Sequence, residues 1–396
     1  MMKIVSKFKI DEKVKSIFWW YIVSRLLLLG LLIGLNGLDI AKLFDCEHYI
    51  NIARNGYSQK FEYAFFPLFP LVIKYLGIAG AIFLNQVAVL GITYFIYRIA
   101  EDEFGYDPVL TCKIWLVSPI AMVTIICYTE PLFILFTISA YWLYKKRKKY
   151  MLAGILLGLS VATRSTGSML FFALFIVMFI DLVRKRERFT NIVKMYVPAT
   201  IISCMYPAYL QWTTGNWKFF VDIQYLYWGK EHSNLVHLIS HIPGVLKRHT
   251  PTVFDKYAVI LILVAPWIFG MAKKQKIKEV VLNIFLVLLL EISVFSDPAR
   301  FDFIGMILLL IYFIINIVKR RKDTSNLDLH LYMLLSILAI TSTDAVASSP
   351  TISYYRYIFA CFPCYFLLPQ KNITINIEMI ILSIVSVLFY AGMFFY

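Results

Sequence analysis

The stretch that decides the fold is SIFWWYIVSRLLLLGLLIGL, residues 16–35, in which Arg25 is the only charged side chain. A helix of roughly 20 apolar residues is long enough to cross the hydrocarbon core of a bilayer. The stretch also lacks the small-residue pattern at which signal peptides are cleaved. We therefore expect residues 16–35 to form a first membrane-spanning helix that is not removed.

Apolar runs of this kind recur along the whole chain. The protein has 396 residues, of which 60% are hydrophobic and 17% aromatic, and its mean hydropathy is +0.72. A soluble fold of this length cannot bury so much apolar surface. We count about thirteen runs close to the spanning length. The sequence predicts an all-α polytopic membrane protein with about 13 transmembrane helices, forming a single domain over residues 1–396.

Basic residues lie in short clusters between the apolar runs. The net charge is +15. A nucleic-acid-binding surface would gather this charge on one face, whereas short clusters at helix ends follow the positive-inside rule. We therefore expect no nucleic-acid partner and a cytoplasmic N-terminus, with the basic clusters on the cytoplasmic side. The clusters are residues 3–15, 145–149, 184–188, 273–278 and 319–322.

The remaining polar segments then fall on the opposite, outer face of the membrane. Successive cytoplasmic clusters must be separated by an even number of crossings, which places predicted helices at about 79–98, 110–127 and 192–212. Because nearly every polar cluster poor in Lys and Arg lies there, we expect the active site on that face. These segments are a first outer loop (about 37–69), YTEP (128–131), TRSTG (163–167), a long outer loop (about 213–256), SDPAR (296–300) and residues 343–357.

The first outer loop contains LFDCEHYINIARNGY, residues 43–57, which is unusually polar for this chain. Residues 45–55 are predicted to form a short helix with Asp45 as N-cap and Gly56 just beyond its end. Asp45, His48 and Ile52 would share one face. FEYAFFPLFP, residues 61–70, then suits a segment lying along the membrane surface. Asp45 is either a helix cap or a general base for transfer to a hydroxyl.

Three segments resemble motifs of the PIG-V family, the second mannosyltransferase of glycosylphosphatidylinositol synthesis. FDCEHYINIARNGY followed by EYAFFPLFP is similar to that family's first signature. SPIAMVTIICYTEPLF resembles its S-P-A…Y-T-E-x-L-F element, and ATRSTG resembles its A-x-R-S-x-G element. The resemblance covers at least residues 44–167. Later segments, TGNWKFFVDIQYLYWGKE and YYRYIFACFP, look like elements of the wider GT-C class of glycosyltransferases.

The resemblance implies a GT-C fold and an integral membrane glycosyltransferase. Such an enzyme takes a sugar, mannose in the named family, from a polyprenyl (dolichyl) phosphate carrier, and passes it to a lipid-linked or glycan acceptor on the non-cytoplasmic face. Transfer would invert the anomeric carbon, with Asp45 in the position of the base. No cofactor is expected and transfer is expected to be metal-independent. The resemblance does not carry over the acceptor, and it places the enzyme in the plasma membrane of a prokaryote or the endoplasmic reticulum of a eukaryote.

The cations on the outer face are candidate ligands for the donor phosphate. An Arg on that face is not explained by the positive-inside rule and should have an anionic partner. A guanidinium binds phosphate oxygens as a fork and would stabilise the departing lipid phosphate. The alternative is that the side chain reaches toward lipid headgroups. The candidates are Arg164, Arg356 and Arg300.

Other residues near these motifs are candidates for catalysis or sugar contact. Glu130 is either a second functional carboxylate or an ordinary helix-terminal one, and His48 could orient Asp45 or touch a substrate. Arg25 is expected to face the helix bundle, in a structural role or against a lipid carrier. Metal binding by the histidines of the long outer loop is not favoured, and CFPC (361–364) is expected to be inert packing. Candidate acceptor or sugar contacts are Glu47, Tyr49, Tyr128 and Tyr355.

Two other functions fit part of the pattern. A transporter or flippase of lipid-linked sugars would also have many helices, but transporters place charges at midplane, often in repeated halves. A ligase that transfers a whole lipid-linked glycan would differ only in the size of its donor. The polar clusters at one membrane face favour the glycosyltransferase.

Overall fold

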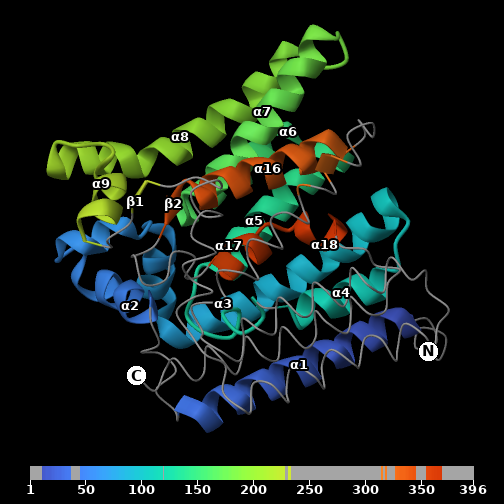
Figure 1. Ribbon diagram of the computed structural model, residues 1–396, viewed down its shortest axis with the longest axis horizontal. Helices are drawn as coiled ribbons and strands as arrows, with labels where there is room; N and C mark the ends of the chain where they lie inside the picture. The colour runs from blue at the N-terminus through green and yellow to red at the C-terminus, as the bar shows by residue number, and fades with distance from the viewer. Residues whose placement is uncertain are drawn as a thin grey trace, which may run out of the picture.

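The structure is a computed structural model, which describes residues 11–36, 45–118, 120–227, 231–232, 314, 317–318, 326–344 and 354–367. The described residues are almost entirely helical, as Figure 1 shows. The first part of the chain contains α1 (Glu12–Asn36), α2 (Asp45–Asn55), the short helix η2 (Lys60–Ala64), α3 (Leu68–Ile99), η3 (Ala100–Phe104), α4 (Pro108–Leu116), α5 (Glu130–Trp142) and η4 (Leu143–Arg147). It continues with α6 (Tyr150–Thr163), α7 (Gly167–Val183), α8 (Phe189–Thr214), α9 (Phe219–Leu226), α16 (Leu327–Thr341), α17 (Tyr354–Ala360) and α18 (Cys364–Leu367).

A small strand pair joins two segments far apart in the sequence. Strand β1 (Glu231–His232) pairs antiparallel with β2 (Thr343–Asp344), so that Glu231 lies opposite Asp344. The pair brings the start of the predicted long outer loop to the segment that follows α16. Both segments were predicted to lie on the same face of the membrane, and their pairing agrees with that prediction.

Two of the described helices are long and apolar enough to cross a membrane. They are α1, over Glu12–Gly34, and α3, over Leu68–Phe104, whereas α6, α7 and α16 are apolar but shorter. Helix α1 confirms the helix predicted at residues 16–35. The predicted all-α class is confirmed for the described residues, and the predicted number of about 13 spans is not confirmed by them.

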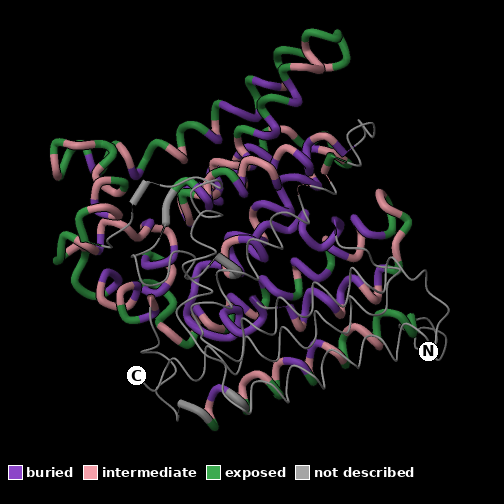
Figure 2. The backbone as a smooth tube through the Cα atoms, viewed as in Figure 1, coloured by how far each residue is buried: buried purple, intermediate pink, exposed green. Residues whose placement is uncertain are grey.

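Apolar side chains cover much of the outer surface of the described helices. Figure 2 shows α1 and α8 partly exposed, while α5 is buried along most of its length. Trp19 of α1 is 66% exposed, Phe83 of α3 is 70% exposed and Met205 of α8 is 66% exposed. Soluble proteins rarely leave such large apolar groups in water over several helices, whereas lipid-facing helices present them routinely. The surface therefore fits the predicted membrane setting.

Glycines allow α6 and α8 to pack closely. A side chain at Gly158 would lie 2.7 Å from the Cβ of Ile202 and 3.0 Å from the carbonyl oxygen of Ala199. A side chain at Gly154 would clash with the carbonyl of Met195. Small residues spaced four apart let two membrane helices approach backbone to backbone. Gly154 and Gly158 therefore fix how closely α8 lies against α6.

The segment before α5 differs from the sequence-based prediction. A helix was expected over residues 110–127, but α4 ends at Leu116, and the chain reaches α5 through turns. Arg25 stabilises this arrangement: it donates to the carbonyl oxygen of Leu116 at 2.7 Å and to the Thr124 hydroxyl at 2.5 Å. The expected inward orientation of Arg25 is confirmed, and its observed contacts are structural.

Helix α3 also begins earlier than predicted, at Leu68 instead of residue 79. Its regular geometry is interrupted at Gly77, whose φ of 72° and ψ of 173° are open to glycine and strained for other residues. The helix therefore consists of a short first arm, from Leu68 to Leu76, and a longer second arm. The predicted helix 192–212 is confirmed as α8.

Candidate active site

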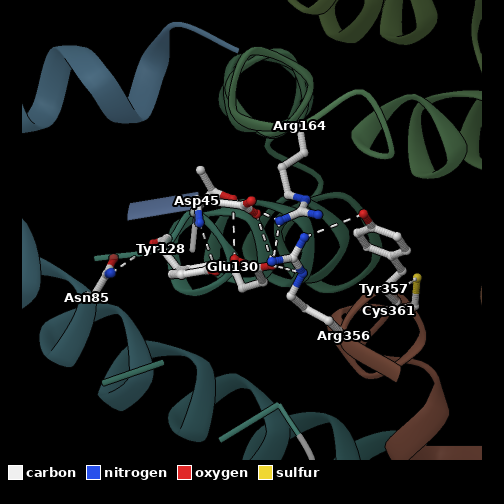
Figure 3. A network of polar contacts seen from close by, with 9 residues as sticks. Asp45, Asn85, Tyr128, Glu130, Arg164, Arg356, Tyr357 and Cys361 are labelled. Atoms are coloured by element: carbon white, nitrogen blue, oxygen red, sulfur yellow. Dashed lines mark hydrogen bonds and ion pairs between the residues drawn. The ribbon is translucent and has the colours of Figure 1, made fainter. Parts of the chain in front are cut away.

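Four charged side chains from distant parts of the chain meet at one place (Figure 3). Asp45 lies at the start of α2 and Glu130 at the start of α5. Arg164 lies directly after α6, in the turn before α7, and Arg356 lies on α17. Three of them come from the three segments that carry the motifs of the first outer loop, YTEP and TRSTG. The three motifs, which the sequence places on one face, therefore lie next to one another in the structure.

Arg356 contacts both carboxylates. Its Nη1 donates to Oδ2 of Asp45 at 2.8 Å, and its Nε lies 3.1 Å from Oε1 of Glu130, off the direction of a good hydrogen bond. Arg164 adds a second cation, because its Nη1 donates to the same Glu130 oxygen at 2.5 Å and to the Thr129 hydroxyl at 2.9 Å. Glu130 therefore bridges the two guanidinium groups.

The charges of the four groups cancel, and they are largely removed from solvent. The Glu130 side chain is 0% exposed, those of Arg164 and Arg356 are 13% and 12% exposed, and that of Asp45 is 20% exposed. Buried charges are tolerated when they are paired, and removing one partner leaves the other uncompensated. Asp45 is thus the member of the cluster that is most open to a ligand.

Nearby charges keep both arginines protonated. Burial opposes the charge on Arg164, but the Glu130 carboxylate together with Tyr49 and Tyr357 outweighs it, and the pKa of that guanidinium is raised. Burial also opposes the charge on Arg356, and Asp45 and Glu130 together raise its pKa well above the ordinary value. Both arginines are therefore permanent cations, which is what binding of a phosphate requires.

Two tyrosine rings flank the Arg356 guanidinium. Its Cζ lies 5.2 Å from the ring centre of Tyr128 and 5.3 Å from that of Tyr357. The ring of Tyr357 also lies 5.3 Å from Cζ of Arg164. Burial, reinforced by the negative charge of Asp45, raises the pKa of Tyr128, so its phenol stays protonated. The Tyr128 hydroxyl accepts a hydrogen bond from the backbone nitrogen of Asp45 at 3.2 Å.

The backbone around Tyr128 and Glu130 is held from α3. Asn85 is fully buried and donates from Nδ2 to the carbonyl oxygens of Ile126 and Tyr128, at 3.2 and 2.9 Å. Gln86 donates to the carbonyl oxygen of Thr124 at 2.8 Å. Backbone carbonyls in the irregular segment before α5 would otherwise be buried without partners. The two amides therefore fix the approach to α5 and hence the position of Glu130.

Helix α2 has the bounds that the sequence predicted. It runs over Asp45–Asn55, and Gly56 follows with a φ of 71° and a hydrogen bond from its nitrogen to the carbonyl oxygen of Ile52 at 2.9 Å. Asp45 and His48 nevertheless have different contacts. Asp45 reaches Arg356, whereas the His48 ring packs against Phe61 and Phe65, with centroids 5.3 and 5.1 Å away.

The other predicted site residues are distributed more widely. Glu47 is exposed on α2, and Tyr49 is 4% exposed and packs against Phe65, Phe69 and Tyr128. The buried position of Tyr49 favours a packing role over sugar contact. Arg300 and the Tyr355 side chain lie outside the part of the chain that the structure describes. Among the described residues, no group of three or more His, Cys, Asp and Glu is arranged to hold a metal ion.

Sequence reasoning missed four residues that support the site: Thr129, Asn85, Tyr357 and Glu62. Glu62 is fully buried and accepts hydrogen bonds from the backbone nitrogens of Ser58 and Gln59, both at 2.8 Å, and from the Asn51 side chain. It thereby ties the end of α2 to η2. The Gln59-x-x-Glu62 spacing of a capping box was a usable signal for Glu62. An Asn within the apolar run of α3 was a signal for Asn85, because buried amides need partners.

Comparison with known proteins matches these motifs to a family. The model of the family described as Mannosyltransferase (PIG-V) matches residues 36–222. Residues 36–222, a little under half of the chain, are thus similar to the PIG-V family, as the three motifs predicted. The matched residues include Asp45, Glu130 and Arg164 and end before α17. Arg356 therefore joins the PIG-V residues from a part of the chain that the family match does not reach.

Two curated relatives carry the same name and come from one fungal species. "GPI mannosyltransferase 2" of Cryptococcus neoformans var. neoformans serotype D, strain JEC21, is 27% identical over 142 residues, which is 31% of this chain and 33% of the relative. The protein of strain B-3501A gives the same values. The alignment thus spans about a third of the length of these PIG-V relatives. No solved structure matches the chain significantly.

Proposed function

We propose that this protein is an integral membrane mannosyltransferase that uses a polyprenyl (dolichyl) phosphate mannose as its donor. The observation that carries the proposal is the buried cluster of Asp45, Glu130, Arg164 and Arg356. It combines a carboxylate that is open to a ligand with two permanent cations, at the meeting point of the PIG-V motifs. The match of residues 36–222 to the family model described as Mannosyltransferase (PIG-V) supports the choice of sugar and reaction.

Asp45 is the proposed general base. The acceptor hydroxyl attacks the anomeric carbon of mannose from the face opposite the phosphate, and Asp45 takes the hydroxyl proton as the new C–O bond forms. The bond between the anomeric carbon and the phosphate oxygen breaks, and its electron pair stays on the phosphate. The configuration of the anomeric carbon is therefore inverted. A positioned base of this kind contributes about 10²- to 10⁴-fold to a rate.

Arg164 and Arg356 are proposed to bind the donor phosphate. During transfer, negative charge moves from Asp45, which becomes protonated, to the lipid phosphate, which gains a charge as it leaves. Arg356 contacts Asp45 in the resting site. It can therefore stabilise the negative charge on the phosphate as the charge on Asp45 is neutralised. Fixed cations aimed at developing charge lower the barrier without reorganising during the reaction. Glu130 holds the two guanidinium groups together and takes no part in the proposed proton transfer.

The acceptor is proposed to be a hydroxyl of a lipid-linked sugar or other glycan. The reaction is proposed to occur on the outer face of the membrane, because the basic clusters are predicted to be cytoplasmic. The membrane would be the plasma membrane in a prokaryote and the endoplasmic reticulum in a eukaryote. The proposed transfer needs no nucleotide, since the polyprenyl phosphate is itself the leaving group.

The test compares Asp45→Asn with wild-type protein in a donor screen. We expect wild type to transfer mannose from polyprenyl phosphate mannose and to leave GDP-mannose unused. Asp45→Asn preserves size and helix-capping ability but cannot accept the proton, so we expect transfer to fall by about 10²-fold or more.

Asp107→Asn is the matched control. Asp107 caps α4 through the backbone nitrogens of Val109 and Leu110, and Asn can make the same cap. We expect this variant to keep wild-type transfer. Turnover by Asp45→Asn close to that of wild type would exclude Asp45 as the base, and use of GDP-mannose alone would exclude the proposed donor.

A further inference from the structure

Tyr357 is the one described residue whose ring approaches both arginines of the site. Its centre lies 5.3 Å from Cζ of Arg164 and 5.3 Å from Cζ of Arg356, and its hydroxyl lies 3.5 Å from Nη2 of Arg356. Figure 3 shows the ring beside the two guanidinium groups, on the side away from Asp45. The electron-rich face of an aromatic ring attracts cations at this distance.

Two guanidinium groups this close repel each other unless something neutral or negative lies between them. In the resting site Glu130 bridges them, and Asp45 neutralises Arg356. A phosphate that enters as proposed above must take over part of this role. Asp45 is the carboxylate that the phosphate can replace on Arg356, because its side chain is 20% exposed whereas that of Glu130 is 0% exposed.

When Arg356 exchanges Asp45 for the donor phosphate, its side chain must keep its position. An arginine side chain has many rotamers, and it loses a fixed position when its charged partner leaves. The ring of Tyr357 attracts the guanidinium charge through its own π face, so this attraction does not use up the N–H groups that a carboxylate or phosphate binds. Tyr357 can therefore hold Arg356 and Arg164 in place while the N–H edge changes partner.

We propose that Tyr357 is a positioning residue for donor binding, whose ring keeps Arg164 and Arg356 side by side as Arg356 passes from Asp45 to the donor phosphate. The proposal rests on the proposed function, since it takes the donor to be a polyprenyl phosphate. It assigns Tyr357 no contact with the reacting atoms. Tyr128 also lies against Arg356, but the contacts that the structure gives it reach only one of the two arginines.

The test measures binding of a short-chain polyprenyl phosphate to detergent-purified protein, with the uncharged polyprenol as reference. Tyr357→Phe keeps the ring and removes the hydroxyl, so we expect affinity within about twofold of wild type. Tyr357→Leu removes the ring, and we expect the phosphate to bind about tenfold more weakly, the scale of losing one or two cation–π contacts. Polyprenol binding should not change in either variant.

A series of fluorinated phenylalanines at position 357 separates electrostatics from packing. Each added fluorine withdraws charge from the ring face and barely changes the shape of the side chain. We expect phosphate affinity to fall stepwise with fluorine number while the melting temperature stays constant. This series also keeps the test informative if Tyr357→Leu fails to fold.

Phe359→Leu is the control for loss of an aromatic ring from α17. Phe359 is 1% exposed and packs against Tyr365. We expect this variant to melt earlier and to bind the phosphate as wild type does. In transfer assays, Tyr357→Leu should raise KM for the donor by more than it lowers kcat, whereas a general loss of folded protein would lower kcat alone.

The outcomes separate the two proposals. If wild type transfers mannose and binds the phosphate, but affinity is flat across the fluorinated series, the role of Tyr357 is excluded and the proposed function stands. An equal loss in Tyr357→Phe and Tyr357→Leu would also exclude it, because the hydroxyl would then be the important group. If wild type binds no polyprenyl phosphate, the proposed function fails and the role of Tyr357 with it.

Discussion

Arg356 contacts both carboxylates of the candidate site and therefore links the proposed base to the charge of the proposed donor. The Asp45–Arg356 contact joins residues separated by 311 positions and uses an aspartate that is partly open to solvent. An anion that needs the same guanidinium edge must compete with Asp45 for it. In the resting protein, Asp45 is thus both the proposed base and an internal competitor of the donor.

This competition predicts opposite effects of one substitution on binding and on transfer. Asp45→Asn leaves Arg356 with a neutral partner, so a short-chain polyprenyl phosphate should bind about three- to tenfold more tightly than to wild type. Equilibrium binding in detergent measures this affinity, with Asp107→Asn as the matched control at wild-type affinity. Weaker or unchanged binding to Asp45→Asn would mean that Asp45 and the phosphate do not share Arg356.

Local patterns predicted the residues of the site better than their contacts. Asp45, Gly56 and Arg164 were found because a cap, a helix-ending glycine and an unexplained outer-face arginine each leave a local signal. The pairing of Asp45 with Arg356 leaves no local signal, because it depends on how α17 packs against α16 and α5. The contacts of His48 were missed for a related reason: sharing a helix face with Asp45 does not decide what that face meets.

At the level of elements, the short α4 shows where apolar periodicity misleads. The run over residues 110–127 is mostly apolar, so its length predicted a helix, yet α4 ends at Leu116. Pro119 follows Ser118 in the sequence, and the residue before a proline is disfavoured in a helix. The helix-ending signal of Pro119 was outweighed in the prediction by the high hydropathy of the run. The irregular segment that replaces the predicted helix carries Tyr128 into the site.

The packing of α6 on α8 gives a prediction about stability. Gly158→Leu would place a side chain against Ile202 and the backbone of Ala199. Overpacking of this kind costs about 1–3 kcal/mol, so the melting temperature of the purified protein should fall by several degrees. Since α6 ends next to Arg164, transfer activity should fall as well.

Gly30 of α1 supplies the control, because no described residue beyond the neighbouring backbone of α1 comes within 4 Å of the position that a side chain would occupy. Gly30→Leu should therefore melt within a degree or two of wild type. Equal losses in the two variants would show that helix propensity, not contact between α6 and α8, decides the effect.

On the scale of the whole molecule, the alternating directions of successive helices place polar and basic segments at opposite ends of the helix bundle. Helices α5, α6, α7 and α8 follow one another through short connections, so their turns fall alternately at opposite ends of the bundle. Glu130 and Arg164 lie at one end, and the basic segments 145–149 and 184–188 lie at the other. This arrangement agrees with the predicted separation of polar and basic clusters between the two faces of the membrane.

Single cysteines test the orientation. Lys60 of η2 and Arg186 of the α7–α8 turn are both exposed, and five of the six native cysteines are buried, Cys204 being the exception. In a Cys204→Ser background, we expect a membrane-impermeant maleimide added from the outer side to label Lys60→Cys and not Arg186→Cys. Permeabilised membranes should allow both to react. Labelling of Arg186→Cys in sealed membranes would reverse the proposed orientation.

The contact between α8 and η2 has a consequence for the architecture of the chain. The Tyr206 hydroxyl donates to the carbonyl oxygen of Tyr63 at 2.8 Å, and the ring of Phe219 packs on that of Tyr63. The last helices of the family-matched segment thus return to its first outer loop and close it on itself. Residues after α9 that the structure describes then add one charged group to a nearly complete site, the guanidinium of Arg356. Among the described residues, the candidate site is therefore built by the family-matched segment and completed by a single cation from α17.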